Sequence, residues 1–321
     1  MLVAILCSVL SLAVAGGVFM CFLVAFVIFK GTLYRSEKHE RSRDCAENAL
    51  DEQKEMFRIG TEWAEQYKDI TESLHIVHDG LNLYGEYINF GYDRCAVIIQ
   101  GRTESLLYSY YYAEVYAKNG YNILTIDTRA HGLSDSKFLT AGIKEHGDLI
   151  AWLELIKEKY GIKSFTTHGI CIGGATSIYA YCATKKDMLI DKIVVDGLYT
   201  SYYEIFKNHI IEREKPIFVF VYLTFLYTFL CTGANLFKYT PFKCMKEIDI
   251  PILFIWSEQD IYCVPEKGKE LFEECASRHK EKRFFPVGRH SFVRYNDSEG
   301  YDEVISEFLK KHDKACRHAT T

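Results

Sequence analysis

Residues 168–174 read His-Gly-Ile-Cys-Ile-Gly-Gly and place a cysteine where a sharp turn joins a predicted strand to a predicted helix. Such a turn has a strained backbone and little room beside it, so Gly169 and Gly173 must lack side chains. The thiol of Cys171 then projects above the sheet at a helix N-terminus, whose dipole favours a thiolate. The backbone N–H of Ile172 points to where an acyl oxyanion would form. The segment predicts nucleophilic attack by Cys171 on an acyl group.

A nucleophile of this kind needs a general base, and the base needs an acid to orient it. Asp260 lies on the loop after a predicted strand at 252–256, and His290 lies on the loop after the next predicted strand at 283–286. We predict that His290 is the base for Cys171 and that Asp260 orients His290. Two other carboxylates compete for the role of the acid: Asp196 and Glu258.

A second donor to the oxyanion is predicted in the loop after the strand at 96–100. Residues 100–105 read Gln-Gly-Arg-Thr-Glu-Ser. Gly101 permits close approach of the backbone, and we expect the N–H of Arg102 to face the acyl oxygen together with that of Ile172.

Each of these features also has an ordinary structural interpretation. Cys171 is then one more buried thiol, Asp260 a turn or helix-cap residue, His290 a surface histidine, and residues 100–105 a simple strand–helix loop.

The 11 cysteines are scattered and odd in number, without the spacing of a zinc site, which predicts free thiols and a reducing compartment. No metal ion or organic cofactor is implied.

The rest of the chain predicts a scaffold that joins these loops. Apolar strand-like stretches alternate with amphipathic helical stretches, which is typical of an α/β fold. Strands are predicted at 74–78, 83–89, 96–100, 122–127, 164–168, 192–196, 252–256 and 283–286. Helices are predicted at 105–118, 143–160, 173–184, 265–277 and 301–312. The first two strands flank the turn pair Asp79-Gly80 and should be antiparallel, whereas the others predict a mostly parallel eight-stranded sheet flanked by helices.

Together these motifs resemble the α/β-hydrolase superfamily over residues 72–315. Residues 100–105 and 127–134, the latter reading Asp-Thr-Arg-Ala-His-Gly-Leu-Ser, are similar to loops of bacterial lysophospholipases, monoacylglycerol lipases and the serine aminopeptidase-like branch. The resemblance implies the α/β-hydrolase fold, the chain order nucleophile, acid, histidine, and structural roles for Arg129 and His131.

The sequence departs from that branch at two positions. Cys171 stands where serine is usual, as a cysteine also does in dienelactone hydrolase. Gln100 stands where histidine or proline is common. A thiolate attacks readily, but the acyl-thioester that it forms must then be hydrolysed with help from His290.

Residues 2–29 carry no charge and are long enough to cross a bilayer as a helix. A signal peptide cleaved near residues 13–15 is the competing interpretation, but the start has no basic residue and the apolar run is long. Several basic residues follow the span: Lys30, Arg35, Lys38, Arg41 and Arg43. By the positive-inside rule they predict a single-pass anchor in the cell membrane with the body on the cytoplasmic side. A net charge of −5 without a basic cluster argues against nucleic acid as a partner.

We divide the chain into a transmembrane anchor at 1–29, a charged helical linker at 30–70 and an α/β-hydrolase domain at 71–321. Residues 200–246 interrupt the alternation of strands and helices, and residues 216–237 within them carry no charge. A second membrane crossing there would separate Asp260 and His290 from Cys171. A helical lid insert is therefore favoured, with a buried core helix as the other alternative.

The sequence thus predicts a membrane-anchored hydrolase that cleaves an acyl ester or thioester of a small acyl or lipid-like substrate, with a triad of Cys171, His290 and Asp260. Acyl transfer to an acceptor other than water would use the same residues. The competing hypothesis is a non-catalytic protein of this fold that binds a lipid or a protein partner at the membrane.

Overall fold

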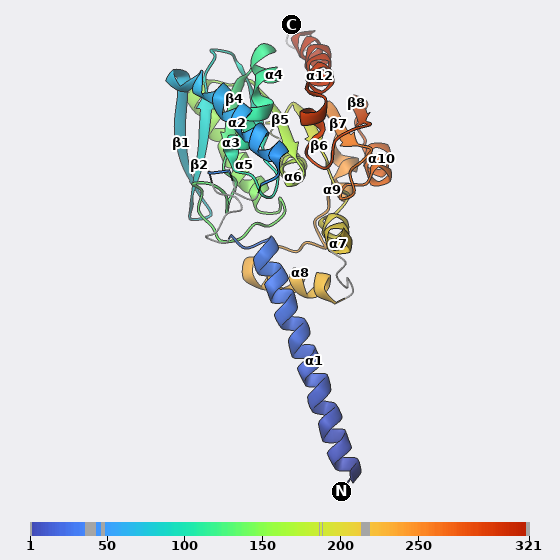
Figure 1. Cartoon of the computed structure of the whole chain (residues 1–321). Coiled ribbons are helices and arrows are strands. Elements are labelled where there is room, and N and C mark those ends of the chain that lie inside the picture. The colour runs from blue at the N-terminus through green and yellow to red at the C-terminus, as the bar shows by residue number, and fades with distance from the viewer. Residues whose placement is uncertain are drawn as a thin grey trace.

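The computed structural model describes residues 2–35, 43–45, 49–185, 187, 189–212 and 219–318. Lys38, Arg41 and residues 216–218, which entered the predictions above, lie outside these ranges. One eight-stranded sheet with helices packed on it forms the body, and a long helix, α1 (Leu2–Thr32), projects from the body with the N-terminus at its far end (Figure 1).

The predicted eight-stranded, mostly parallel sheet of the α/β-hydrolase fold is confirmed. Its strands are β1 (Thr71–His78), β2 (Leu81–Ile88), β3 (Arg94–Ile99), β4 (Asn122–Ile126), β5 (Ser164–Ile170), β6 (Lys192–Asp196), β7 (Ile252–Ser257) and β8 (Lys280–Phe285). They follow the order β1-β2-β4-β3-β5-β6-β7-β8. β2 pairs antiparallel with both β1 and β4, and the remaining neighbours are parallel.

The inner strands explain the apolar runs in the sequence. All residues of β4, β6 and β7 are buried, because helices cover both faces of a parallel sheet. The edge strand β8 begins at Lys280, three residues before the predicted start. Its residues 281–283 are charged and do not form an apolar run, because an edge strand is partly solvated.

The helices of the body flank these strands. They are α2 (Asp51–Glu65), α3 (Leu106–Ser109), α4 (Ala113–Lys118), α5 (Glu145–Tyr160), α6 (Ile172–Thr184), α7 (Tyr202–Glu212), α8 (Phe220–Thr232), α9 (Pro241–Cys244), α10 (Pro265–Glu274), α11 (Val293–Asn296) and α12 (Ser298–His318), with 3₁₀ turns η1 (Lys68–Ile70), η2 (Tyr110–Tyr112) and η3 (Met245–Glu247). The single helix predicted at 105–118 is instead α3, η2 and α4. Three consecutive buried tyrosines cannot share one face of an α-helix, and the tighter 3₁₀ turn redirects them into the core.

The segment 30–70 contains α2, which packs on the body. Met56 and Trp63 on its inner face are buried, and the ring of Trp63 lies against that of Tyr110 in η2, with ring centroids 6.2 Å apart. The charged side chains of α2 face outward, which gives the segment its polar composition.

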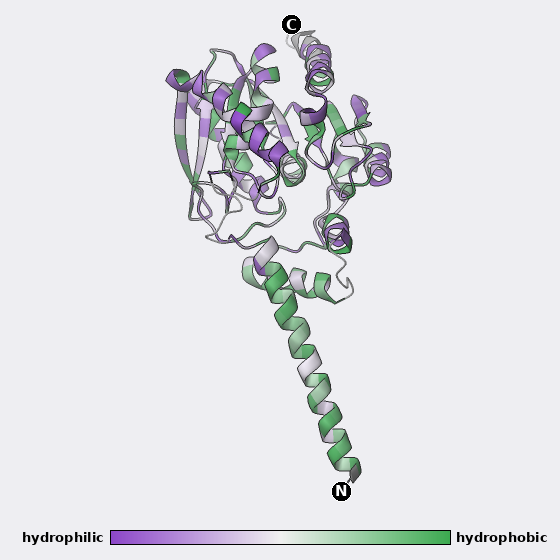
Figure 2. Ribbon diagram, in the orientation of Figure 1, coloured by the Kyte–Doolittle hydropathy of each residue, from purple (hydrophilic) through white to green (hydrophobic). Residues whose placement is uncertain are grey.

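α1 is long and apolar enough to cross a membrane, and most of its residues are exposed. Figure 2 shows apolar residues along its whole length. Its C-terminal end is built into the body, because Ala25, Phe29 and Leu33 are buried and the Phe29 ring stacks on those of Phe138 and Tyr227.

The insert at 200–246 lies between β6 and β7 and contains α7, α8 and α9. α8 crosses the end of α1 (Figure 1), where the hydroxyl of Tyr227 donates a hydrogen bond to the carbonyl of Phe22 at 3.3 Å. A helix of 13 residues is about 20 Å long, short of the roughly 30 Å hydrocarbon core. α8 is therefore too short for the second membrane crossing that hydropathy suggests.

Candidate active site

Cys171 stands between β5 and α6 in a strained backbone conformation, with φ 53° and ψ −108°. A Cβ atom at Gly169 would lie 2.2 Å from the backbone carbon of Gly173, and one at Gly173 would lie 2.2 Å from the carbonyl oxygen of Ile99. Only glycine fits at both positions, so the spacing of residues 169–173 is a packing requirement of this turn.

Asp260 and His290 meet on the loops that follow β7 and β8. The ring Nδ1 of His290 lies 2.7 Å from Oδ2 of Asp260, and because a carboxylate only accepts, Nδ1–H is the donor. The other carboxylate oxygen accepts the backbone N–H groups of Tyr262 and Cys263, both at 2.8 Å. These bonds fix both the carboxylate and the orientation of the imidazole.

The two rival acids make other contacts. Asp196, at the end of β6, accepts a hydrogen bond from the hydroxyl of Tyr301 at 2.8 Å, and burial raises its pKa to about 6. Glu258 is exposed to solvent. Of the three carboxylates considered from the sequence, Asp260 is the one hydrogen-bonded to His290.

The electrostatics of the pair favour a charged imidazole. Burial alone would lower the pKa of His290, but the charge and the hydrogen bond of the Asp260 carboxylate raise it well above its usual value. Burial opposes the charge of Asp260, but the imidazole and the two backbone N–H groups lower the pKa of this carboxyl. Nε2 of His290 is buried and has no hydrogen-bond partner among the described residues.

Cys171 and His290 line one pocket of about 170 Å³ together with Gly101 and Arg102. Within the described residues, no hydrogen bond joins the thiol of Cys171 to the imidazole of His290. Contacts of this kind are often long in a resting enzyme and shorten when substrate binds. The structure thus brings the predicted nucleophile, base and oxyanion loop to the same cavity.

The start of α6 and the loop of Arg102 both adjoin Cys171. Ile172 is the first residue of α6, so its N–H has no acceptor within the helix. A Cβ atom at Gly101 would lie 4.0 Å from Cβ of Cys171, which places the loop of Arg102 against Cys171. The carbonyl of Arg102 accepts a hydrogen bond from Nε2–H of His131 at 2.9 Å, and this contact holds the loop in place.

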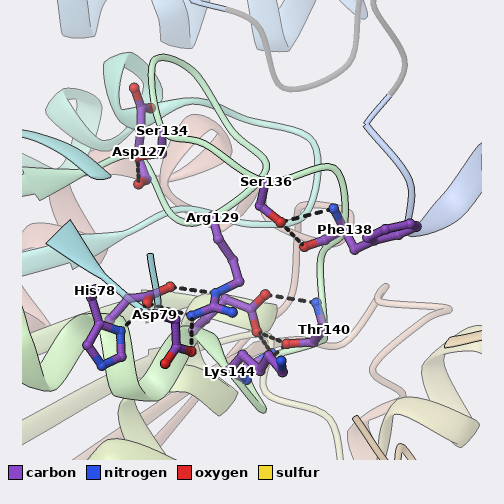
Figure 3. A network of polar contacts seen from close by, with 12 residues as sticks. His78, Asp79, Asp127, Arg129, Ser134, Ser136, Phe138, Thr140 and Lys144 are labelled. Carbon is purple, nitrogen blue, oxygen red and sulfur yellow. Dashed lines mark hydrogen bonds and ion pairs between the residues drawn. The ribbon is translucent and has the colours of Figure 1, made fainter. Parts of the chain in front are cut away.

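The loop at 127–134 is fixed by a polar network (Figure 3). Arg129 donates two hydrogen bonds to Asp148, at 2.7 and 2.6 Å, and a third to Asp79 at 3.2 Å. Both Arg129 and Asp148 are buried, so loss of either side chain would leave the charge of the other buried and uncompensated. The ring of His131 on the same loop is also held at Nδ1, which lies 2.9 Å from Oγ1 of Thr128.

Sequence reasoning missed a second thiol at this site. The Sγ atom of Cys263, a ring nitrogen of His290 and a carboxylate oxygen of Asp260 all lie within 4.8 Å of one another. Its place three residues after Asp260 was the only signal in the sequence. These are ligand types that Zn²⁺ accepts, but the bond between Asp260 and His290 already uses one ligand atom of each.

Sequence reasoning also missed two aromatic rings that wall the pocket. The rings of His209 in α7 and Tyr262 are stacked, with centroids 3.8 Å apart, and both residues line the pocket of Cys171. The side chain of Asn208 donates a hydrogen bond to the carbonyl of Tyr262 at 2.8 Å. The insert is therefore attached directly to the loop that carries Asp260.

Comparisons with known proteins agree with this fold. The family model described as alpha/beta hydrolase fold matches residues 97–236. An uncharacterized protein of Bacillus subtilis (strain 168), YqkD, is 25% identical over 218 residues, which cover 66% of this chain and 70% of that protein. Protein bem46 of Schizosaccharomyces pombe is 29% identical over 201 residues, which cover 62% of this chain and 60% of that protein.

Among solved structures, the esterase Pf2001 of Pyrococcus furiosus superimposes with a TM-score of 0.64 at 23% identity, covering 76% of this chain and 93% of that one. At this identity the likeness concerns the fold. The sheet order and the family match over residues 97–236 show the α/β-hydrolase fold.

Proposed function

We propose that this protein is a membrane-anchored hydrolase of acyl esters or thioesters, with Cys171 as the nucleophile, His290 as the base and Asp260 as the residue that orients His290. The observation that carries the proposal is the Asp260–His290 hydrogen bond beside a strained cysteine that lines the same pocket. The esterase name of the Pyrococcus protein agrees with this reaction class.

Acylation uses the atoms that face the pocket. Nε2 of His290 takes the thiol proton of Cys171, and Sγ attacks the carbonyl carbon of the substrate. The oxyanion that forms accepts hydrogen bonds from the N–H groups of Ile172 and Arg102. The imidazolium then gives its proton to the departing alcohol or thiol, and the acyl group remains on Sγ as a thioester.

Deacylation reverses the roles with water. The neutral imidazole of His290 removes a proton from water, and the oxygen attacks the thioester carbonyl on Cys171. When the intermediate collapses, Sγ leaves and recovers its proton from the imidazolium, and the carboxylic acid is released. Throughout, Asp260 holds Nδ1–H so that Nε2 remains the atom facing the pocket.

The environment of the second thiol argues for Cys171 as the nucleophile. Cys263 is buried, and burial raises the pKa of its thiol well above the usual range. A thiol in that setting stays protonated and is a poor nucleophile. Cys171 instead stands in a strained turn at the N-terminus of α6, where it lines the same pocket as His290.

Membrane attachment is part of the proposal. α1 would span the bilayer, and the basic residues in and after its last turn, Lys30, Arg35 and Arg43, favour a body on the cytoplasmic side. α8 and the rest of the insert would form a cap that faces the membrane, since α8 exposes the apolar side chains Leu226, Phe229 and Leu230.

The test compares the full-length protein with Cys171→Ala, Cys171→Ser and Cys263→Ala on butyryl esters, butyryl thioesters and lactones. Loss of Cys171 should reduce turnover by at least about 1000-fold, as loss of a triad nucleophile does in other enzymes. Cys263→Ala is the matched control for removal of a thiol near His290, and it should retain turnover within about tenfold.

Two results would contradict the proposal. One is equal turnover by the wild type and Cys171→Ala, which would leave a binding protein of this fold. The other is loss of turnover in Cys263→Ala with Cys171→Ala unaffected.

A gain of ester turnover in Cys171→Ser would show that the thiol restricts an ester-hydrolase framework. Iodoacetamide should alkylate Cys171 faster than the other thiols of the body if the site activates it.

A further inference from the structure

We infer that the acyl chain of a single-chain membrane lipid reaches Cys171 through an apolar groove between α1 and the insert, so that the tail stays in contact with the bilayer while the carbonyl is cleaved. This inference rests on the proposed function, for which it names the substrate class and the route of entry.

The groove has a volume of about 690 Å³, compared with about 170 Å³ for the pocket of Cys171. Its walls are apolar and come from α1 and from two helices of the insert, which is far from α1 in the sequence: Leu23, Val24 and Val27 of α1, Phe206 and Ile210 of α7, and Phe220 of α8. An exposed apolar groove of this size is unfavourable in water and is typical of a binding surface for an apolar ligand.

The groove lies next to the active-site pocket, with which it shares part of its wall. Arg102 and His209 line both cavities. Arg102 belongs to the proposed oxyanion loop, and its side chain donates a hydrogen bond to the carbonyl of Thr32 at the end of α1, at 3.4 Å. An acyl chain that lies along α1 would therefore end with its carbonyl beside the N–H of Arg102.

The position of the groove along α1 explains why its occupant is a membrane lipid. The 31 residues of α1 span about 46 Å, whereas about 20 residues cross the hydrocarbon core. The groove lies on the last part of the helix, from Met20 to Thr32, next to the body. If the preceding residues fill the bilayer, the groove opens at its surface, where the apolar α8 also lies (Figure 2).

The decisive variant fills the groove without touching the catalytic residues. Gly31 lines the groove, and a Cβ atom there would meet no atom within 4 Å, so Gly31→Trp places an indole in the groove. Gly17→Trp is the matched control, because Gly17 is equally open, lies on the same helix and does not line the groove.

The kinetic assay uses the full chain in phosphatidylcholine nanodiscs with 1-butyryl- and 1-palmitoyl-glycerol. We expect Gly31→Trp to lower the rate on the palmitoyl ester at least tenfold and to keep the butyryl rate within twofold of the wild type. Gly17→Trp should keep both rates. Equal loss on both esters, or no loss on the palmitoyl ester, would overturn the inference. So would cleavage of an S-palmitoyl peptide together with no cleavage of 1-palmitoyl-glycerol.

A binding assay separates this inference from the proposed catalysis. Cys171→Ala in nanodiscs is irradiated with 1-palmitoyl-glycerol that carries a diazirine at the chain end, and labelled peptides are mapped. We expect label on α7, which is outside the membrane span, and its loss when Gly31→Trp is added. Label on α7 with no turnover by the wild type would retain the groove and reject the hydrolase. Label confined to α1 would overturn the groove.

Discussion

The imidazole of His290 donates a hydrogen bond of 2.7 Å to the carboxylate of Asp260, across 30 residues of sequence. The bond connects the loops after β7 and β8, and it leaves Nε2 of His290 buried, without a partner among the described residues and on the wall of the pocket that contains Cys171. Because the carboxylate stabilises the imidazolium, the pair determines both the direction in which the base points and the pH at which it becomes neutral.

The pH dependence of deacylation should follow His290. The carboxylate of Asp260 raises the pKa of His290 above 6.5, so the neutral imidazole needed to activate water appears only at higher pH. The rate of thioester hydrolysis in a single-turnover assay should therefore rise with pH, with a midpoint above 6.5. A midpoint below 6.5 would contradict the role of His290 as the base.

Asp260→Asn tests the same pair. Loss of the carboxylate removes the charge that raises the pKa of His290, so an NMR titration of this imidazole should move to lower pH. The amide that replaces the carboxylate can also hold the imidazole of His290 in the wrong tautomer. We therefore expect kcat to fall by about 10⁴-fold, the size of the effect in serine proteases. Glu258→Gln changes an exposed carboxylate and should leave both measurements unchanged.

Asp196→Asn should change how stability depends on pH. Burial raises the pKa of Asp196 to about 6 in the folded chain, so the folded state holds this proton more tightly than the unfolded state does. Its contribution to stability is present below about pH 4 and declines as the pH rises to about 6. The Asp196→Asn variant lacks this decline. From pH 4 to pH 7 its free energy of unfolding should therefore rise by about 1–3 kcal/mol relative to that of the wild type. Urea titrations of both proteins in detergent measure the difference, and a constant difference would contradict the prediction.

His131→Ala tests the support of the oxyanion loop. His131 is buried and its Nε2–H holds the carbonyl of Arg102, so its loss should let the N–H of Arg102 drift from the acyl oxygen. We expect kcat on a butyryl ester to fall by about 10- to 100-fold, less than the loss of a whole oxyanion donor. The rate at which iodoacetamide alkylates Cys171 should not change. A parallel decrease in both rates would indicate a general loss of folding, and His131→Gln should partly restore kcat.

Gly169→Ala tests the packing of the turn at Cys171. The added methyl group would lie 2.2 Å from the backbone of Gly173, so the strand and the helix must separate. We expect a loss of at least about 3 kcal/mol in the free energy of unfolding. Gly174→Ala is the milder control, because its methyl group meets the nearest atom at 3.2 Å. Equal unfolding midpoints for the two variants would contradict this explanation of the spacing.

Local features of the site could be predicted from the sequence. Gly169 is required by its contact with Gly173 four residues away, although Gly173 is itself required by a contact with Ile99 of β3. A run of apolar residues such as 252–256 is required by burial on both faces of a parallel sheet. The alternation of such runs with amphipathic helices is likewise local, so the eight strands and most helices followed from pattern alone. The exceptions lie where tertiary packing overrides the pattern, as in the broken helix of residues 106–118.

Only the tertiary structure decided which distant side chains meet. Asp196, Glu258 and Asp260 all follow strands and look equivalent in the sequence, yet loop geometry gives Asp260 alone of the three a hydrogen bond to His290. Cys263 beside His290, and the groove that α1 shares with α7 and α8, depend on segments up to about 200 residues apart. Periodicity reports which face of one element is buried, but the partner that buries it is determined by the packing of the whole chain.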